Sequence, residues 1–160
     1  MSEFVKFAAS IGKKIITANC QIEKDSSKPG LVRRAVDFPS LMLSLGFSPA
    51  FTFYISKIEK YENVYKVYQT LKGNSTDNSA ICEELQKKES AGYSGYVGIL
   101  LFTLEKIGKN ISVSPDVNKL YSALIDLATK VSFKDERMIE RMILPYLNEI
   151  KKVMEALPYE

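Results

Sequence analysis

The spacing of the apolar residues is the feature that most restricts how this chain folds. Apolar side chains recur at intervals of three and four along almost the whole sequence, which is the repeat of one face of an α-helix. No convincing hairpin signal interrupts this pattern. The spacing therefore predicts an all-α protein, a bundle of about six or seven helices that forms a single domain over residues 1–160.

Two helices are expected in the first part of the chain. The first is amphipathic and covers about residues 4–22, ahead of a loop of turn-forming residues at 25–30. The second covers about residues 31–45 and contains Pro39, which either kinks the helix or marks a boundary, because proline lacks the amide donor and clashes with the preceding turn. Gly46 is expected to end this helix as a left-handed cap.

A third helix is expected to start at Ser48 and Pro49, since serine is a good N-cap and proline suits the first helical position. Its apolar spacing continues to about residue 72. A polar connector at 73–78 follows, and then a short charged helix over about 79–88.

The remaining sequence predicts three more helices. Residues 96–107 are apolar nearly all round, which is typical of a central buried helix, with a buried strand as the alternative for so short a run. A cap signature at 114–116 opens the next helix. Ser132 and Asp135 resemble a capping box and predict a last helix that bends near Pro145.

The composition argues against an enzyme. The chain has no histidine, which excludes Ser-His-Asp and Cys-His catalysis and zinc sites with imidazole ligands. Two cysteines, Cys20 and Cys82, cannot provide a four-ligand zinc site. They are expected to be small buried residues in a reducing cytosol, with a disulfide between them as the open alternative. We expect no catalytic residue, no metal and no cofactor.

Carboxylates cluster only at the start of the last expected helix, at Asp135, Glu136 and Glu140. Arg137 and Arg141 lie between them. This arrangement indicates surface ion pairing rather than the inward-facing carboxylates of a two-metal nuclease.

A membrane location is not expected. The longest uncharged apolar stretch, residues 93–104, is shorter than the about 20 residues of a spanning helix. Lys6, Lys13 and Lys14 interrupt the apolar positions that a signal peptide would need. A cytoplasmic protein is therefore expected, and a first helix lying on an anionic membrane surface is the weaker alternative.

Positive charge is concentrated in the first part of the chain. Residues 1–66 hold ten Lys and Arg against six Asp and Glu, whereas residues 114–160 have a net charge of −1. The candidate cations form three clusters: Lys13 with Lys14, Arg33 with Arg34, and Lys57 with Lys60. Such clusters suit a phosphate backbone. Composition alone nevertheless favours a solvated surface on which Arg33 pairs with Asp37.

Aromatic residues of the third expected helix could stack on nucleobases, since an aromatic face accepts any base. Their spacing of three and four indicates core positions instead. Tyr54 and Tyr61 are the two candidates for exceptions at the rim of the core.

The stretch VRRAVDFPSLMLSLGFSPAFTFYISK, residues 32–57, resembles the small helical subunit of type III-B (Cmr) CRISPR effector complexes. That family has a basic helix before a proline, then a glycine followed by Leu or Phe, and then a helix with an Ala-x-x-Phe-Tyr-x-x-Lys-like pattern. The matching positions are Arg33, Arg34, Pro39, Gly46, Phe47, Phe53, Tyr54 and Lys57. The small subunits of type III-A and type I effectors remain alternatives.

The resemblance implies a non-catalytic role in antiviral defence. Several copies would associate head-to-tail as a minor filament beside other subunits of the effector complex and would contact the backbone of the duplex of guide RNA and target RNA. Arg33, Arg34 and Lys57 are the first candidates for that contact, and Lys13, Lys14 and Lys60 are the second. The alternative from another class is a helical adaptor that binds only protein.

Overall fold

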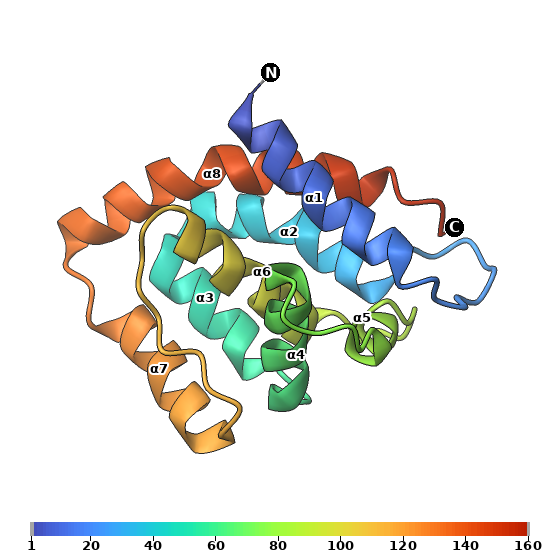
Figure 1. Ribbon diagram of the computed structural model, residues 1–160. Coiled ribbons are helices and arrows are strands. Elements are labelled where there is room, and N and C mark those ends of the chain that lie inside the picture. The colour runs from blue at the N-terminus through green and yellow to red at the C-terminus, as the bar shows by residue number, and fades with distance from the viewer. Residues whose placement is uncertain (1, 160) are drawn as a thin grey trace.

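Over residues 2–159, which the computed structural model describes, the chain forms eight α-helices and no β-strand (Figure 1). The helices are α1 (Glu3–Thr17), α2 (Gly30–Leu45), α3 (Phe47–Ser56), α4 (Tyr61–Lys72), α5 (Ser79–Glu84), α6 (Tyr93–Lys106), α7 (Val117–Thr129) and α8 (Phe133–Glu155). The prediction of an all-α bundle is confirmed. The number of helices exceeds the expected six or seven because the expected third helix is in fact two helices, α3 and α4.

The break between α3 and α4 lies at residues 57–60, where no glycine or proline marks it. Lys57 ends α3 with a tight turn, and its N–H donates to the carbonyl of Tyr54 over 3.1 Å. Lys60 has extended backbone angles and precedes α4. The spacing of apolar residues stays at three and four across the turn, so the periodicity alone predicted one continuous helix.

α2 and α3 meet at Gly46, whose φ of +94° lies in the region that favours glycine. This residue ends α2 and also precedes α3, so α3 begins at Phe47. The prediction of Ser48 as the N-cap of this helix is therefore wrong: Ser48 lies inside the first turn. Carboxylates from α8 bind the free N–H groups of that turn, as described below.

α6 is the central helix, and the prediction of a buried helix rather than a buried strand is confirmed. Its apolar side chains are almost all inaccessible to solvent, and those with 0% exposure are Tyr96, Val97, Ile99, Leu100, Leu101 and Leu104. Gly98 permits close packing on α4, because a Cβ there would lie only 2.9 Å from the carbonyl oxygen of Val64. The helix starts at Tyr93, three residues earlier than expected.

α8 lies along one side of the bundle and packs against α1 and α2 (Figure 1). Ser132 is its N-cap and accepts a hydrogen bond from the N–H of Asp135 over 3.1 Å, as the sequence predicted. α7 begins with a similar cap, in which Asp116 accepts from the N–H of Lys119. None of the helices in the described part of the chain is long and apolar enough to span a membrane.

A disulfide joins Cys20 to Cys82, which corrects the expectation of two separate buried thiols. α1 ends at Thr17 rather than near residue 22, and the chain then runs without helix to residue 29. The disulfide attaches this segment to α5. The cysteines are 62 positions apart, and their Cα atoms lie 5.3 Å from each other.

Candidate nucleic-acid interface

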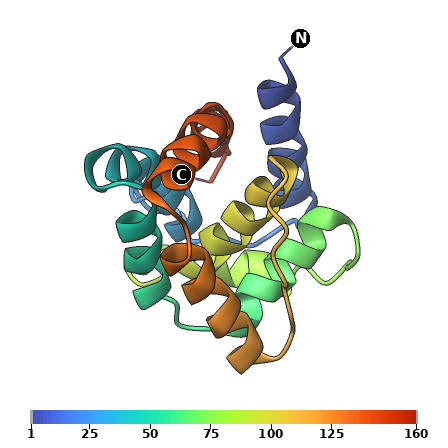
Figure 2. The same cartoon turned by 90° about the vertical axis from the view of Figure 1, so that its left-hand side faces the viewer.

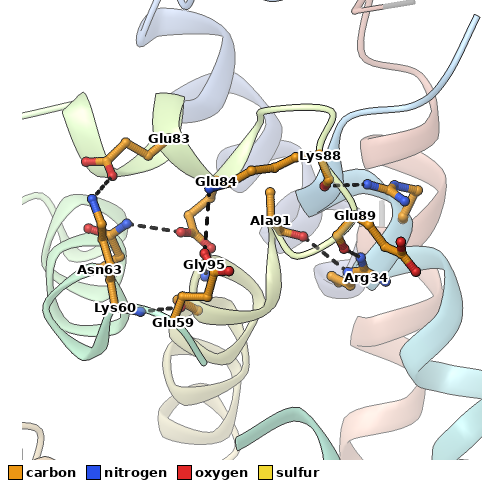
Figure 3. Close-up of polar contacts among 12 residues, drawn as sticks. Arg34, Glu59, Lys60, Asn63, Glu83, Glu84, Lys88, Glu89, Ala91 and Gly95 are labelled. Carbon is orange, nitrogen blue, oxygen red and sulfur yellow. Dashed lines mark hydrogen bonds and ion pairs between the residues drawn. The ribbon is translucent and has the colours of Figure 1, made fainter. Parts of the chain in front are cut away.

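Arg34 is buried, with only 7% of its surface exposed. Its Nε donates to the carbonyl of Ala91 over 3.2 Å, and a terminal nitrogen donates to the carbonyl of Glu89 (Figure 3). The guanidinium also lies 4.0 Å from the centroid of the Tyr93 ring. The charged group of Arg34, a predicted phosphate ligand, is thus turned inward and engaged by protein groups.

Arg33 binds the same loop from the neighbouring position of α2. One of its terminal nitrogens donates to the carbonyl of Lys88 over 2.7 Å, while its Nε is buried without a hydrogen-bond partner. The expected pair of Arg33 with Asp37 does not form in the described structure. The two arginines together hold the backbone of residues 87–91, which we call the arginine-bound loop.

Lys14 caps the C-terminus of α4. Its Nζ donates to the carbonyl of Leu71 over 2.8 Å and to that of Thr70 over 3.2 Å. A cation at this end of a helix is favourable because the last carbonyls have no partner within the helix. Lys14 is half-buried, so its ammonium group serves the fold.

Lys60 is exposed but paired with Glu83 of α5, at 2.5 Å between Nζ and the carboxylate. The hydrogen bond that it donates to Glu83 is the main cause that raises the pKa of Lys60. Lys88 of the arginine-bound loop pairs with Glu59 at 3.6 Å (Figure 3). Exposed pairs of this kind contribute little to stability, and a phosphate could compete for either lysine.

Lys57 is exposed at the end of α3, beside an aromatic ring. Its Nζ lies 5.5 Å from the centroid of Phe53, one helical turn earlier. Phe53 is 44% exposed, whereas Tyr54 is only 2% exposed and donates its hydroxyl to the carbonyl of Arg34. The expectation of Tyr54 as a rim aromatic is therefore wrong. Tyr61, the second such candidate, is half-buried against Tyr121.

Lys13 is exposed on α1, and neither it nor Lys57 makes an ion pair within residues 2–159. α1 and α3 lie on opposite sides of the molecule (Figures 1 and 2). The six predicted cations hence do not form one surface. Arg33, Arg34 and Lys14 bind backbone carbonyls, and Lys60 pairs with an acid. Lys13 is exposed on α1, and Lys57 is exposed at the end of α3.

A hollow of about 410 Å³ lies beside Phe53. It is lined by one face of α2, by α3 and by the start of α6, through Asp37, Ser40, Leu41, Ser44, Phe53, Tyr54 and Tyr93. We call it the Phe53 hollow. Burial raises the pKa of Tyr54 well above its ordinary value, and the charge of the nearby Asp37 adds to this rise. Sequence reasoning missed the hollow, although the spacing of Asp37, Leu41 and Ser44 places them on one helical face.

Glu84 is the one carboxylate that is buried among the described residues, at 7% exposed. It accepts hydrogen bonds from the side-chain amide of Asn63 over 3.0 Å and from the N–H of Gly95 over 2.6 Å (Figure 3). Burial raises the pKa of Glu84, while these two donors oppose the rise. Glu84 links α4, α5 and α6. No group of three or more metal-binding side chains occurs among residues 2–159.

Fold and surface together define a small all-α protein with a cationic and aromatic patch on α3. The same fold occurs in a chain of a cryo-EM structure described as the type III-B Cmr-beta complex bound to non-cognate target RNA. The two chains are 25% identical, with a TM-score of 0.69 over 99% of this chain and 97% of that one. The resemblance to a Cmr subunit of similar size is thus confirmed. No family model matches the chain, and no curated protein does.

Proposed function

We propose that this protein is a non-catalytic small subunit of a type III CRISPR effector complex. Copies of it associate head-to-tail in a minor filament and contact the backbone of the duplex of guide RNA and target RNA in antiviral defence. The observation that carries the proposal is the likeness, over nearly the full length of both chains, to a chain of a Cmr-beta complex bound to target RNA.

Lys57 is the cation of this chain that best suits the RNA contact. It is exposed, makes no ion pair within residues 2–159 and is adjacent to the exposed ring of Phe53. A single lysine per copy gives a weak contact, but a filament repeats the contact along the duplex and so multiplies it. Arg33 and Arg34 act indirectly, because they hold the arginine-bound loop.

Isolation of the protein through an affinity tag tests the assembly. We expect guide RNA with CRISPR repeat sequence, together with the other subunits, to co-purify with the tagged chain. Absence of guide RNA from a preparation that retains partner proteins would contradict the RNA-guided role. It would instead support a helical adaptor, which the engagement of four of the six candidate cations with protein groups also favours.

A charge reversal tests the site. Lys57→Glu is expected to weaken retention of target RNA by the assembled complex. The slope of log K against the logarithm of the salt concentration should become less steep by about 0.9 for each copy that contacts the duplex. The matched control is Lys119→Glu, a charge reversal at another exposed lysine, on α7. Equal effects of the two variants would remove the assignment to Lys57 without affecting the assembly result.

A further inference from the structure

The Phe53 hollow has an exposed aromatic wall that the packing of the core does not require. Phe53 is 44% exposed, although most large apolar side chains of α3 are buried. Tyr93 contacts it edge-to-face, with ring centroids 6.5 Å apart, and thereby limits its orientation. An exposed aromatic face costs solvation and is the usual platform for a stacked nucleobase.

Polar groups without partners also line the hollow. Asp37 makes no hydrogen bond or ion pair within residues 2–159, and it is exposed on the face of α2 that lines the hollow. Ser40 and Ser44 add two hydroxyl groups to the same face. A carboxylate accepts from the N–H groups of bases, which are amino groups in adenine, cytosine and guanine and the imino N3–H in uracil. A hydroxyl both donates and accepts, so this edge matches the hydrogen-bonding edge of a base.

The charges of Lys57 and Asp37 are expected to determine the orientation of a bound nucleotide. Lys57 does not line the hollow but lies next to Phe53, with its Nζ 5.5 Å from the ring centroid, and it attracts a phosphate. Asp37 lies on the α2 side and repels one. A nucleotide is therefore expected to place its phosphate near Lys57 and its base between Phe53 and Asp37.

We propose that the Phe53 hollow binds one unpaired nucleobase of RNA, stacked on Phe53 with its polar edge toward Asp37 and its phosphate at Lys57. This inference rests on the proposed function only in that the ligand is RNA. It adds base stacking to a contact that otherwise involves only the backbone of a duplex. The volume of about 410 Å³ is in the range of small-molecule pockets and accommodates a single base.

Fluorescence can test the proposal directly because the chain has no tryptophan. Phe53→Trp places a single reporter in the wall of the hollow. The matched control is Phe133→Trp: Phe133 is 73% exposed, has Arg137 one turn away at 4.9 Å from its ring, and does not line the hollow. Both sites are on the surface, so we expect both variants to keep the thermal midpoint of the wild type.

Each variant is titrated at low ionic strength with single-stranded oligouridine, with a fully paired RNA duplex, with inorganic polyphosphate and with an arginine-rich peptide. Oligouridine is expected to quench the reporter at position 53 strongly and the reporter at position 133 hardly at all, and polyphosphate to quench neither. Phe53→Leu, which keeps an apolar side chain but removes the aromatic face, should weaken binding of oligouridine at least about fivefold.

Equal quenching of the two reporters, or equal quenching by polyphosphate, would overturn the proposal. Quenching of the reporter at position 53 by the peptide alone would also overturn it and would assign the hollow to an arginine of a protein partner. Binding of the duplex, measured by anisotropy, without any quenching by oligouridine would reject the base site but leave the proposed function intact. If neither RNA binds the isolated chain, the base site is rejected, whereas the proposed function is decided by the co-purification of guide RNA with the tagged protein.

Discussion

Glu140 of α8 accepts a hydrogen bond from the backbone N–H of Phe47 over 2.8 Å, across 93 positions of sequence. Glu136, one turn earlier, accepts from the N–H of Ser48 over 2.7 Å. The first turn of α3 is thus capped by carboxylates from another helix, where negative charge is favourable. The sequence interpretation of these acids as surface partners of arginines holds only for the bond between Arg137 and Glu140.

Removal of these caps should loosen the junction of α2, α3 and α8. The double substitution Glu136→Gln and Glu140→Gln is expected to lower the free energy of unfolding by about 1–3 kcal/mol, because two charge-assisted bonds become neutral ones. Chemical denaturation measures the loss. Glu155→Gln on the exposed end of α8 is the control, and an equal effect there would show that only net charge matters.

The disulfide should contribute strongly to stability. Replacement of both Cys20 and Cys82 by serine is expected to cost about 2–4 kcal/mol, since the bridge restricts the unfolded chain. Thermal unfolding with and without reductant provides the measurement. The wild type should lose stability in reductant while the double serine variant does not. Detection of two free thiols in the unreduced wild-type protein would contradict the bridge.

Arg34 should matter for folding rather than for direct RNA contact. Arg34→Met is expected to destabilise the protein by about 2–4 kcal/mol, because it leaves the carbonyls of Ala91 and Glu89 without a donor. Arg34→Lys should restore little, as one ammonium group cannot reproduce the planar fork. Lys57→Met is the control with a near-zero effect on unfolding. A stable Arg34→Met protein with impaired RNA retention would reverse this assignment.

Stability should depend on the charge of Glu84. Burial raises the pKa of Glu84 above its ordinary value of 4.5, so the folded state binds this proton more tightly than the unfolded state. The resulting stabilisation is fully present below pH 4.5 and is lost as the pH rises through the raised pKa. We expect the free energy of unfolding of the wild type, relative to that of Glu84→Gln, to fall as the pH rises over that interval. A difference that rises with pH would contradict the shift.

The sequence predicted those elements whose local pattern decides their structure. The apolar run of α6 allowed only a buried element, and Ser132 with Asp135 specified a helix start. The break between α3 and α4 at residues 57–60 has no local sequence pattern that predicts it, because the apolar spacing continues across it. α3 is apolar on most of its circumference, so its sequence could not show that Phe53, and not Tyr54, faces the solvent.

The site was harder to predict than the fold for a related reason. Arg33, Arg34 and Lys14 are basic residues near the surface in any sequence-based assignment, and each was a reasonable phosphate ligand. Their partners are distant backbone carbonyls, with sequence separations of 55, 57 and 57 for the bonds to Lys88, Ala91 and Leu71. Every residue has the same backbone carbonyl, so the sequence gives no signal that predicts such a bond.

Arg33 and Arg34 bind the arginine-bound loop through its backbone carbonyls, and this affects which side chains of the loop can be substituted. Arg33 and Arg34 are neighbours on α2, and both donate to backbone carbonyls of the same short segment. Neither arginine contacts a side chain of that segment through these bonds. The path of the loop is encoded in α2, and the exposed side chains of Lys88 and Glu89 are left open to change. Substitutions at these two positions, or a label attached there, should leave the path of the loop unchanged.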